Sequence, residues 1–287
     1  MQQYTIAGIT IEVSGKGLDG IPGFTVFSSE QENKKAAIII DAGKALTGIN
    51  IKPLYSFLFD DIQCEFAFAD GKYYYKMIQP DSCDLIMKMQ LRDDTLYITT
   101  NMDDNTPSYW YRFAVWMAFG VFSVTKGIVA IHASTILYNN KAILFLGESG
   151  TGKSTHTQLW LKHIPDTELL NDDSPFVFAD NNCAIAFGSP WSGKTACYKN
   201  IHAPIAGIVR ISQAPHNKIR KLSNLSAIGA IQPSCPPAFV CDEYLSDNIY
   251  GILSLLLQHV PVYSLECLPD EDAVQLVFST LKTDGHI

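Results

Sequence analysis

The most constraining feature of this 287-residue chain is a glycine-rich octapeptide between an apolar run and a segment with helical spacing. The octapeptide, GESGTGKS at residues 147–154, matches the pattern G-x-x-x-x-G-K-[ST]. In a chain of this length a chance match has a probability of about 1%, with glycine at ~7% of residues. The apolar residues 142–146 predict a strand, and TQLWLKHI predicts a helix with Leu159, Trp160 and Ile164 on its apolar side.

A strand, a glycine-rich turn and a helix N terminus in this order form a site for a polyphosphate. Backbone N–H groups and the positive helix end point at one spot. Gly150 and Gly152 allow backbone geometries that side chains forbid, Lys153 can reach the β- and γ-phosphates, and the Ser154 hydroxyl can ligate Mg²⁺. The predicted nucleotide-binding residues are Gly147, Glu148, Ser149, Gly150, Thr151, Gly152, Lys153, Ser154 and Thr155.

The run ELLNDD, residues 168–173, predicts a strand that ends in two adjacent carboxylates. Adjacent acids can divide the work, because one can hold a metal while the other accepts a proton from an attacking hydroxyl. We therefore expect Asp172 and Asp173 to divide metal binding and proton transfer between them. The sequence Asp-Asp-Ser-Pro is also typical of a solvated turn, which is the alternative interpretation.

His132 lies in IVAIHAST, which we expect to be one strand before the strand that leads into the loop. A histidine among apolar neighbours is commonly a hydrogen-bonded core residue. Near a phosphate site it can also orient the acid pair or the phosphoryl group. The sequence leaves both interpretations open.

Composition excludes some partners and suggests a compartment. The formal net charge of −8 argues against binding to duplex nucleic acid. Seven cysteines, an odd number without a C-x-x-C pair, favour reduced thiols over disulfides or a zinc module. The N terminus does not resemble a signal peptide, and the apolar stretch 113–125 is too short to span a bilayer. We expect a cytoplasmic protein with no membrane partner; a homo-oligomer stays an open option.

The chain changes character near residue 126. Residues 1–125 contain short alternating runs that predict a mostly antiparallel, β-rich region. This region ends in a buried helix, for which we expect Thr106 as N-cap and Pro107 at the first position. Residues 126–287 alternate strands and helices, which is typical of an α/β domain, with helices at 248–260 and 271–282 and a strand at 261–267. The predicted fold class is therefore α/β, or α+β over the whole chain.

Three motifs together resemble the catalytic domain of the HPr kinase/phosphorylase family: Ile131-His132-Ala133, GESGTGKS, and Asp172-Asp173. The resemblance covers roughly residues 125–285, and phosphoenolpyruvate carboxykinases share the looser arrangement. It implies a carboxykinase-like P-loop fold with a mixed sheet. It also implies that His132 is the active-site histidine, Lys153 binds phosphate and Asp173 takes a proton from the acceptor serine. Ser154 would then ligate Mg²⁺ with help from Asp172.

The sequence also departs from that family, because the metal-binding Glu after the acidic pair has no convincing counterpart. The corresponding stretch, residues 187–195, looks similar to one in stand-alone bacterial HPr-kinase-like proteins, including those that phosphorylate precursor peptides. Lys194 in this stretch can supply a cation to phosphate or acceptor. The alternative for this stretch is a tight turn with a packed Trp191.

The resemblance implies a kinase that uses ATP and Mg²⁺ to phosphorylate a hydroxyl, with a serine of a protein or peptide as the expected acceptor. Two alternatives keep the same site. One is a small-metabolite kinase, and the other is a non-catalytic regulatory module that senses ATP.

Overall fold

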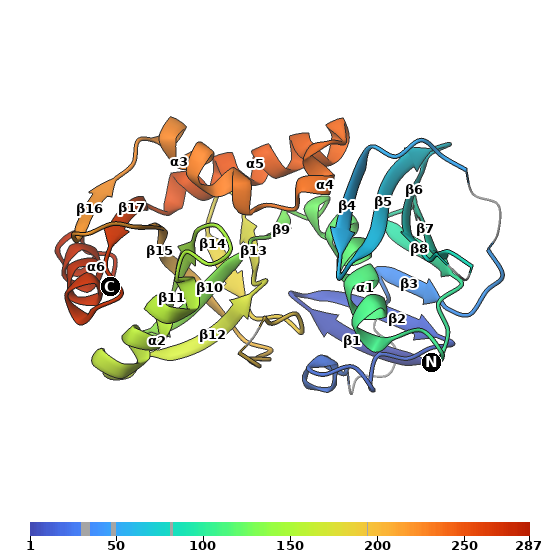
Figure 1. Ribbon diagram of the computed structural model, residues 1–287, viewed down its shortest axis with the longest axis horizontal. Helices are drawn as coiled ribbons and strands as arrows, with labels where there is room; N and C mark the ends of the chain where they lie inside the picture. Colours follow the sequence, from blue (N-terminus) through green and yellow to red (C-terminus); the bar gives the residue numbers. More distant parts are fainter. Residues whose placement is uncertain (30–34, 47–49, 81–82, 194) are drawn as a thin grey trace. The chain divides into compact units, whose positions relative to one another are not determined.

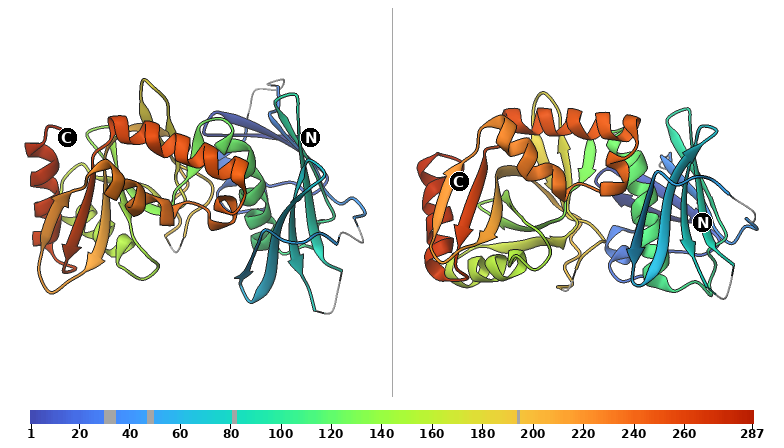
Figure 2. Two further views of the ribbon diagram at one scale, coloured as in Figure 1. Left: turned by 90° about the horizontal axis from the view of Figure 1, so that it is seen from above. Right: turned by 45° about the horizontal axis from the view of Figure 1, so that its top comes forward.

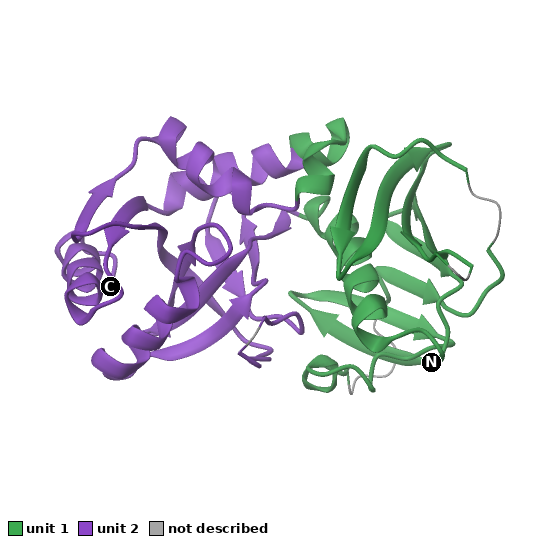
Figure 3. Cartoon of the chain, in the orientation of Figure 1, with its two compact units in different colours: residues 1–126, 237–247 green, residues 127–236, 248–287 purple. Residues whose placement is uncertain are grey.

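The computed structural model describes residues 1–29, 35–46, 50–80, 83–193 and 195–287. These residues form an α/β protein with two mixed sheets. Contacts divide them into two compact units, shown in Figure 3: unit 1 contains residues 1–126 and 237–247, and unit 2 contains 127–236 and 248–287. Residues 237–247 thus group with the N-terminal unit, although the sequence pattern placed them in the C-terminal domain.

Unit 1 is built on a sheet whose described strands follow the order β1-β2-β3-β8-β7-β6-β5-β4. Strand β3 pairs in parallel with β2 and β8, and the remaining neighbours are antiparallel. A short 3-10 helix, η1 (Phe24–Phe27), follows β2. The strands are β1 (Gln2–Ile6), β2 (Ile9–Ser14), β3 (Ile38–Asp41), β4 (Tyr55–Phe59), β5 (Ile62–Ala69), β6 (Lys72–Ile78), β7 (Leu85–Arg92) and β8 (Thr95–Thr100).

The sheet of unit 1 curls like half a barrel around helix α1 (Ser108–Val124), as Figure 2 shows. Near one end of the sheet, the Phe113 ring stacks on Phe59 with centroids 4.0 Å apart. Near the other end, the Tyr111 hydroxyl donates to the carbonyl of Lys16 at 3.1 Å. The apolar residues on nearly all sides of α1 are therefore buried by a sheet that surrounds it.

The predicted cap of α1 is wrong. Pro107 is the residue before the first helical turn, and no side chain caps it. Thr106 Oγ1 instead accepts a hydrogen bond from the Asp103 amide at 3.0 Å. The hydroxyl is thus used to close the turn that leads into the helix. Helix α4 (Pro237–Val240) also belongs to unit 1, where Phe239 lies against Trp116.

Unit 2 contains the second sheet, in the order β12-β10-β11-β15-β14-β13-β9, with β17 paired to β15 and β16 paired to β17. The long strand β15 runs parallel to both β11 and β17. Figure 1 shows it crossing the unit. The strands are β9 (Ile128–Ala130), β10 (Ala133–Tyr138), β11 (Lys141–Leu146), β12 (Glu168–Asp173), β13 (Phe176–Ala179), β14 (Ala184–Phe187), β15 (His202–Gln213), β16 (Lys218–Lys221) and β17 (Val262–Cys267).

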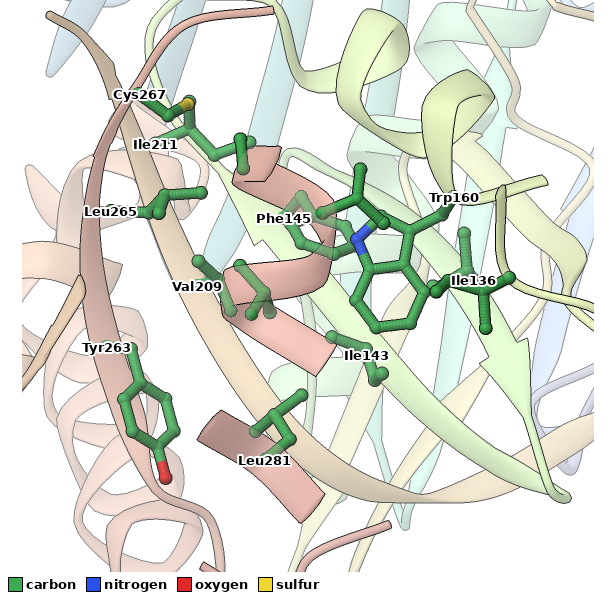
Figure 4. Close-up of a cluster of buried hydrophobic side chains, with 14 of the residues drawn as sticks. Ile136, Ile143, Phe145, Trp160, Val209, Ile211, Tyr263, Leu265, Cys267 and Leu281 are labelled. Carbon is green, nitrogen blue, oxygen red and sulfur yellow. The ribbon is translucent and has the colours of Figure 1, made fainter. Parts of the chain in front are cut away.

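Helices α2 (Lys153–His163) and α6 (Glu271–Thr283) pack on one face of this sheet. Their apolar sides join Val209 and Ile211 in the buried cluster of Figure 4, in which Trp160 is fully buried. Arg210 alternates with these two residues along β15, and its Nη1 donates to the carbonyl of Ala230 at 2.9 Å. Helix α3 (Asn224–Ile231), which carries Ala230, therefore lies on the opposite face.

The remaining helices follow α3 in the chain. A short 3-10 helix, η2 (Gln232–Ser234), directly continues α3. Helix α5 (Glu243–His259) begins in unit 1 and ends in unit 2. None of the helices that the structure describes is long and apolar enough to cross a membrane.

The expected continuous strand IVAIHAST is interrupted. It forms β9 and β10, and Ile131 and His132 lie between them. The reason is that β9 pairs with β13, whereas β10 pairs with β11 and β12. The amides of the two linking residues donate to the carbonyls of Pro175 and Ser234, at 3.1 and 2.7 Å. His132 therefore lies between the two strands and belongs to neither of them.

Gly188, just after β14, tests how tightly the chain packs near the predicted strand-end acids. A Cβ at this position would lie 2.1 Å from the carbonyl oxygen of Lys199, so backbone must move. We expect Gly188→Ala to lower the free energy of unfolding by about 2 kcal/mol in a urea titration. Gly229→Ala is the matched control, because that exposed helical position has open space and should gain roughly 0.5 to 1 kcal/mol. Equal stability of the two variants would contradict the packing described.

Candidate functional site

The register of the second sheet brings three strand ends together. Ala133 at the start of β10 pairs with Leu146 at the end of β11 and with Asp173 at the end of β12. Strand β12 is thus separated from β11 by β10, and the glycine-rich loop begins at the same row of residues at which the acid pair ends. Leu146 also pairs with Arg210 of β15. Sequence reasoning missed Arg210, although a charged residue inside the apolar run IVRI is a usable signal.

The glycine-rich loop leaves the N terminus of α2 open. Gly150 and Gly152 have φ angles of 82° and 101°, which non-glycine residues rarely adopt. Helix α2 begins directly afterwards at Lys153, with no side-chain cap and no acidic residue in its first turn. The first amides of a helix have no partner inside the helix, and together with the helix dipole they attract an anion.

Lys153 is held on the loop that precedes it. Its Nζ donates to the carbonyls of Gly147 and Glu148, at 3.0 and 3.2 Å, and the residue is 9% exposed. Burial lowers the pKa of Lys153, while the nearby Asp173 and Asp172 act in the opposite direction. Phosphate oxygens are stronger acceptors than backbone carbonyls, so the ammonium can transfer its hydrogen bonds to a bound anion.

The Ser154 hydroxyl and the Asp172 carboxylate form a pair of neighbouring oxygen ligands, called the oxygen pair below. The exposed Ser154 hydroxyl donates to Asp172 Oδ1 at 2.9 Å, and Asp172 is 4% exposed. Hydroxyl and carboxylate oxygens suit Mg²⁺, which keeps several ligands from water and phosphate. Within the described ranges, no group of three or more His, Cys, Asp or Glu side chains could hold a metal. The pair supplies two oxygen ligands of the kind that Mg²⁺ takes, and water or another ligand would have to supply the rest.

Asp173 has an unusual backbone and a histidine partner. Its φ is 147°, a region that non-glycine residues rarely occupy. His132 Nδ1 lies 3.2 Å from both the carbonyl oxygen and Oδ1 of Asp173. A carbonyl oxygen only accepts hydrogen bonds, so Nδ1 carries a proton and donates. The two side chains are 45% and 44% exposed, which places His132 beside a carboxylate at the surface and not in the core.

These residues line one cavity of about 390 Å³. Of the predicted loop residues, Gly147, Glu148 and Thr151 are outside its lining, although the carbonyls of the first two hold Lys153. The predicted residue Lys194 lies outside the described residues. The lining residues are His132, Ala133, Ser149, Gly150, Gly152, Lys153, Ser154, Thr155, Asp172, Asp173 and Gly193.

The stretch after β14 is fixed by Asn171, a residue that sequence reasoning did not single out. Its Nδ2 donates to Ser189 Oγ at 3.2 Å and to the Trp191 carbonyl at 3.1 Å. Its Oδ1 accepts from the Ser174 amide at 2.8 Å. Trp191 is 5% exposed, so this part of the stretch is a packed turn. The turn brings Gly193 to the cavity, where a Cβ would lie 3.2 Å from Asp173 Cβ.

A second cavity of about 630 Å³ adjoins the first and shares Gly150, Gly152 and Thr155 with it. One of its walls is His156, which is 3% exposed. Trp160 Nε1 donates to His156 Nε2 at 3.2 Å, and burial lowers the pKa of His156 to about 4. Sequence reasoning missed this cavity because most of its walls come from residues 211–214 and 267–269, far from the loop in sequence.

No family profile and no curated protein matches the chain. Among solved structures, the chain is similar to the Hpr(Ser) kinase/phosphatase from Coxiella burnetii, with 13% identity and a TM-score of 0.31. The superposition covers 54% of this chain and 95% of that one. So distant a likeness says nothing of chemistry, which must come from the geometry of the site.

The buried His156 predicts a pH dependence of stability. The folded chain keeps this imidazole neutral down to about pH 4, whereas in the unfolded chain it binds a proton below its ordinary pKa of 6.5. The unfolded state therefore gains the proton first, and stability falls as the pH drops from 6.5 to about 4. This residue should account for roughly 3 kcal/mol of that loss.

Urea unfolding of wild type and His156→Ala between pH 7 and 4 measures the effect. The stability difference between the two proteins should shrink as the pH falls. His163→Ala, at a partly exposed position of the same helix, is the control and should not remove the dependence. A constant difference between wild type and His156→Ala would contradict the buried neutral state.

Proposed function

We propose that the chain is an Mg·ATP-dependent kinase that transfers the γ-phosphoryl group to a hydroxyl, with a serine of a protein or peptide as acceptor. The observation that carries this proposal is the convergence of Lys153, Ser154, Asp172 and Asp173 on one cavity at an uncapped helix N terminus. Phosphoryl transfer needs positioning and charge stabilisation more than covalent catalysis, and these residue types supply both.

The loop and the oxygen pair bind the phosphates in this proposal. The first amides of α2 and the Lys153 ammonium contact the phosphate oxygens, after Lys153 leaves the carbonyls that it now contacts. Ser154 and Asp172 would hold Mg²⁺, which neutralises charge on the β- and γ-phosphates when bound.

Asp173 is the base. Its carboxylate takes the proton of the acceptor hydroxyl as the oxygen bonds to the γ-phosphorus, and the bond to the bridging oxygen of ADP breaks. His132 donates to Asp173 and fixes the direction of its carboxylate, so it acts as a positioning residue. The strained backbone of Asp173 supports a functional role, because such strain is frequent at active sites.

The exposure of Asp173 favours a polypeptide acceptor. Its side chain is 44% exposed, so a hydroxyl carried on a large chain can reach it from solvent. A small-metabolite kinase more commonly encloses the acceptor and excludes water. Incubation with labelled ATP, cell extract and candidate metabolites separates the acceptors: label in a polypeptide supports the proposal, and label only in a small molecule contradicts it.

Asp173→Asn tests the base. The amide keeps the shape but cannot take a proton, so the transfer rate should fall by about 10² to 10⁴ while Mg·ATP affinity stays close to wild type. Calorimetry measures the affinity, and label transfer measures the rate. Asp172→Asn is the matched control, because it should weaken Mg·ATP binding itself. Wild-type transfer by Asp173→Asn would remove Asp173 from the mechanism.

Lys153→Ala tests the charge on the phosphates. Loss of the ammonium should slow transfer by at least about 10², because the charge developing in the transition state loses its main cation. The fold should survive, which circular dichroism and a urea titration can check. If wild type binds ATP but transfers no phosphate to any acceptor, the chain is an ATP-sensing module and not a kinase.

A further inference from the structure

The second cavity, of about 630 Å³, lies directly beside the phosphate cavity. The two share Gly150, Gly152 and Thr155, so the loop and the start of α2 form a wall common to both. A ligand whose anionic part occupies the first cavity can therefore extend into the second. The size of the second cavity is within the range of pockets for small organic ligands, about 300 to 1,000 Å³.

The side of this cavity formed by β15, β17 and the residues after them is largely apolar, whereas Thr155 and Gln213 supply polar groups. Ile211 and Cys267 come from the neighbouring strands β15 and β17, and Figure 4 shows them at one edge of the buried cluster. The amide of Ala214 donates to the Cys267 carbonyl at 3.1 Å, which joins the two strand ends. Leu268 is 40% exposed and lines the same space. Burial raises the pKa of the Cys267 thiol to about 11, so this wall stays uncharged.

His156 supplies a fixed hydrogen-bond donor in this apolar wall. Because an indole N–H only donates, the bond from Trp160 makes Nε2 the acceptor and places the proton of the neutral ring on Nδ1. Among the described residues, Nδ1 has no hydrogen-bond partner, and it is not one of the fully buried side-chain atoms that lack one, so it borders the cavity that His156 lines. A donor at the wall of a cavity is available to a ligand that enters it.

We propose that the second cavity binds the nucleoside part of the nucleotide, and that His156 determines affinity for it by donating from Nδ1 to an acceptor atom of the base or sugar. Trp160 is a positioning residue, because it fixes which ring nitrogen donates. This inference rests on the proposed function, since it assigns the other half of the same triphosphate ligand.

Inorganic tripolyphosphate separates the two halves of the ligand, because it has the phosphates and no nucleoside. We would measure the Kd of Mg·ATP and of Mg·tripolyphosphate by calorimetry on the full chain. Wild type should bind Mg·ATP at least about tenfold more tightly. Ala214→Trp should fill the second cavity and abolish this preference, while leaving tripolyphosphate affinity unchanged.

Two substitutions of His156 test the contribution of the Nδ1 donor separately from that of the rest of the cavity. His156→Leu and His156→Asn both break the bond from Trp160, so they share any structural defect. Only the Asn amide keeps a donor close to the position of Nδ1. His156→Leu should reduce the preference for ATP by about fivefold, which is the usual net value of one hydrogen bond, and His156→Asn should restore most of it. Neither should change tripolyphosphate affinity.

Each result decides a different point. Equal affinity of wild type for the two ligands, or a preference that survives in Ala214→Trp, overturns the nucleoside pocket and leaves the phosphate site standing. Equal behaviour of the Leu and Asn variants overturns the role of His156. If wild type binds neither ligand, the proposed function fails, and this inference fails with it.

Discussion

The register at Ala133 is the constraint on which the candidate site depends. This one residue pairs with Leu146 on one side and with Asp173 on the other. The pairing of Ala133 therefore aligns the start of the glycine-rich loop with the end of the acid pair. It also places the preceding residue, His132, next to Asp173. A shift by one residue would turn every side chain of β10 to the opposite face of the sheet. Fully buried Ile136 would then leave the hydrophobic cluster of Figure 4, so the packing of this cluster and the site geometry depend on the same pairing.

The same strand pairing constrains the unusual backbone conformation of Asp173. A φ of 147° at a non-glycine residue costs about 1 to 3 kcal/mol, and it persists only where the surroundings determine it strongly. Here the pairing with Ala133, the bridge to Ser192 and the hydrogen bonds from His132 all act on the same residue. The backbone that carries this carboxylate is consequently fixed before any ligand binds, which is a condition for electrostatic preorganisation.

Local patterns predicted much of unit 2, because the strand before the loop, the helix after it and the ELLNDD strand are each encoded in a short window. What sequence could not show is which strands are neighbours. Arg210 lies about sixty residues from the loop and reaches the row only through the parallel pairing of β15 with β11. The break at His132 also depends on pairing, since β9 and β10 have different partners. Thr106 does not cap α1 because its hydroxyl accepts from the Asp103 amide and not from an amide of the first turn.

The net charge of the protein and the charges inside the cavity affect an approaching anion in different ways. A formal net charge of −8 disfavours anions at long range, and salt screens exposed charges beyond about 8 Å at physiological ionic strength. Inside the cavity, burial weakens the protonated state of Lys153, whereas Asp172 and Asp173 favour it. The aspartates thus have two effects: they oppose the burial that lowers the pKa of Lys153, and they repel a bare polyphosphate. In the proposed function, a phosphate that arrives with Mg²⁺ would offer opposite charges to both the acids and the helix N terminus, which a free phosphate does not.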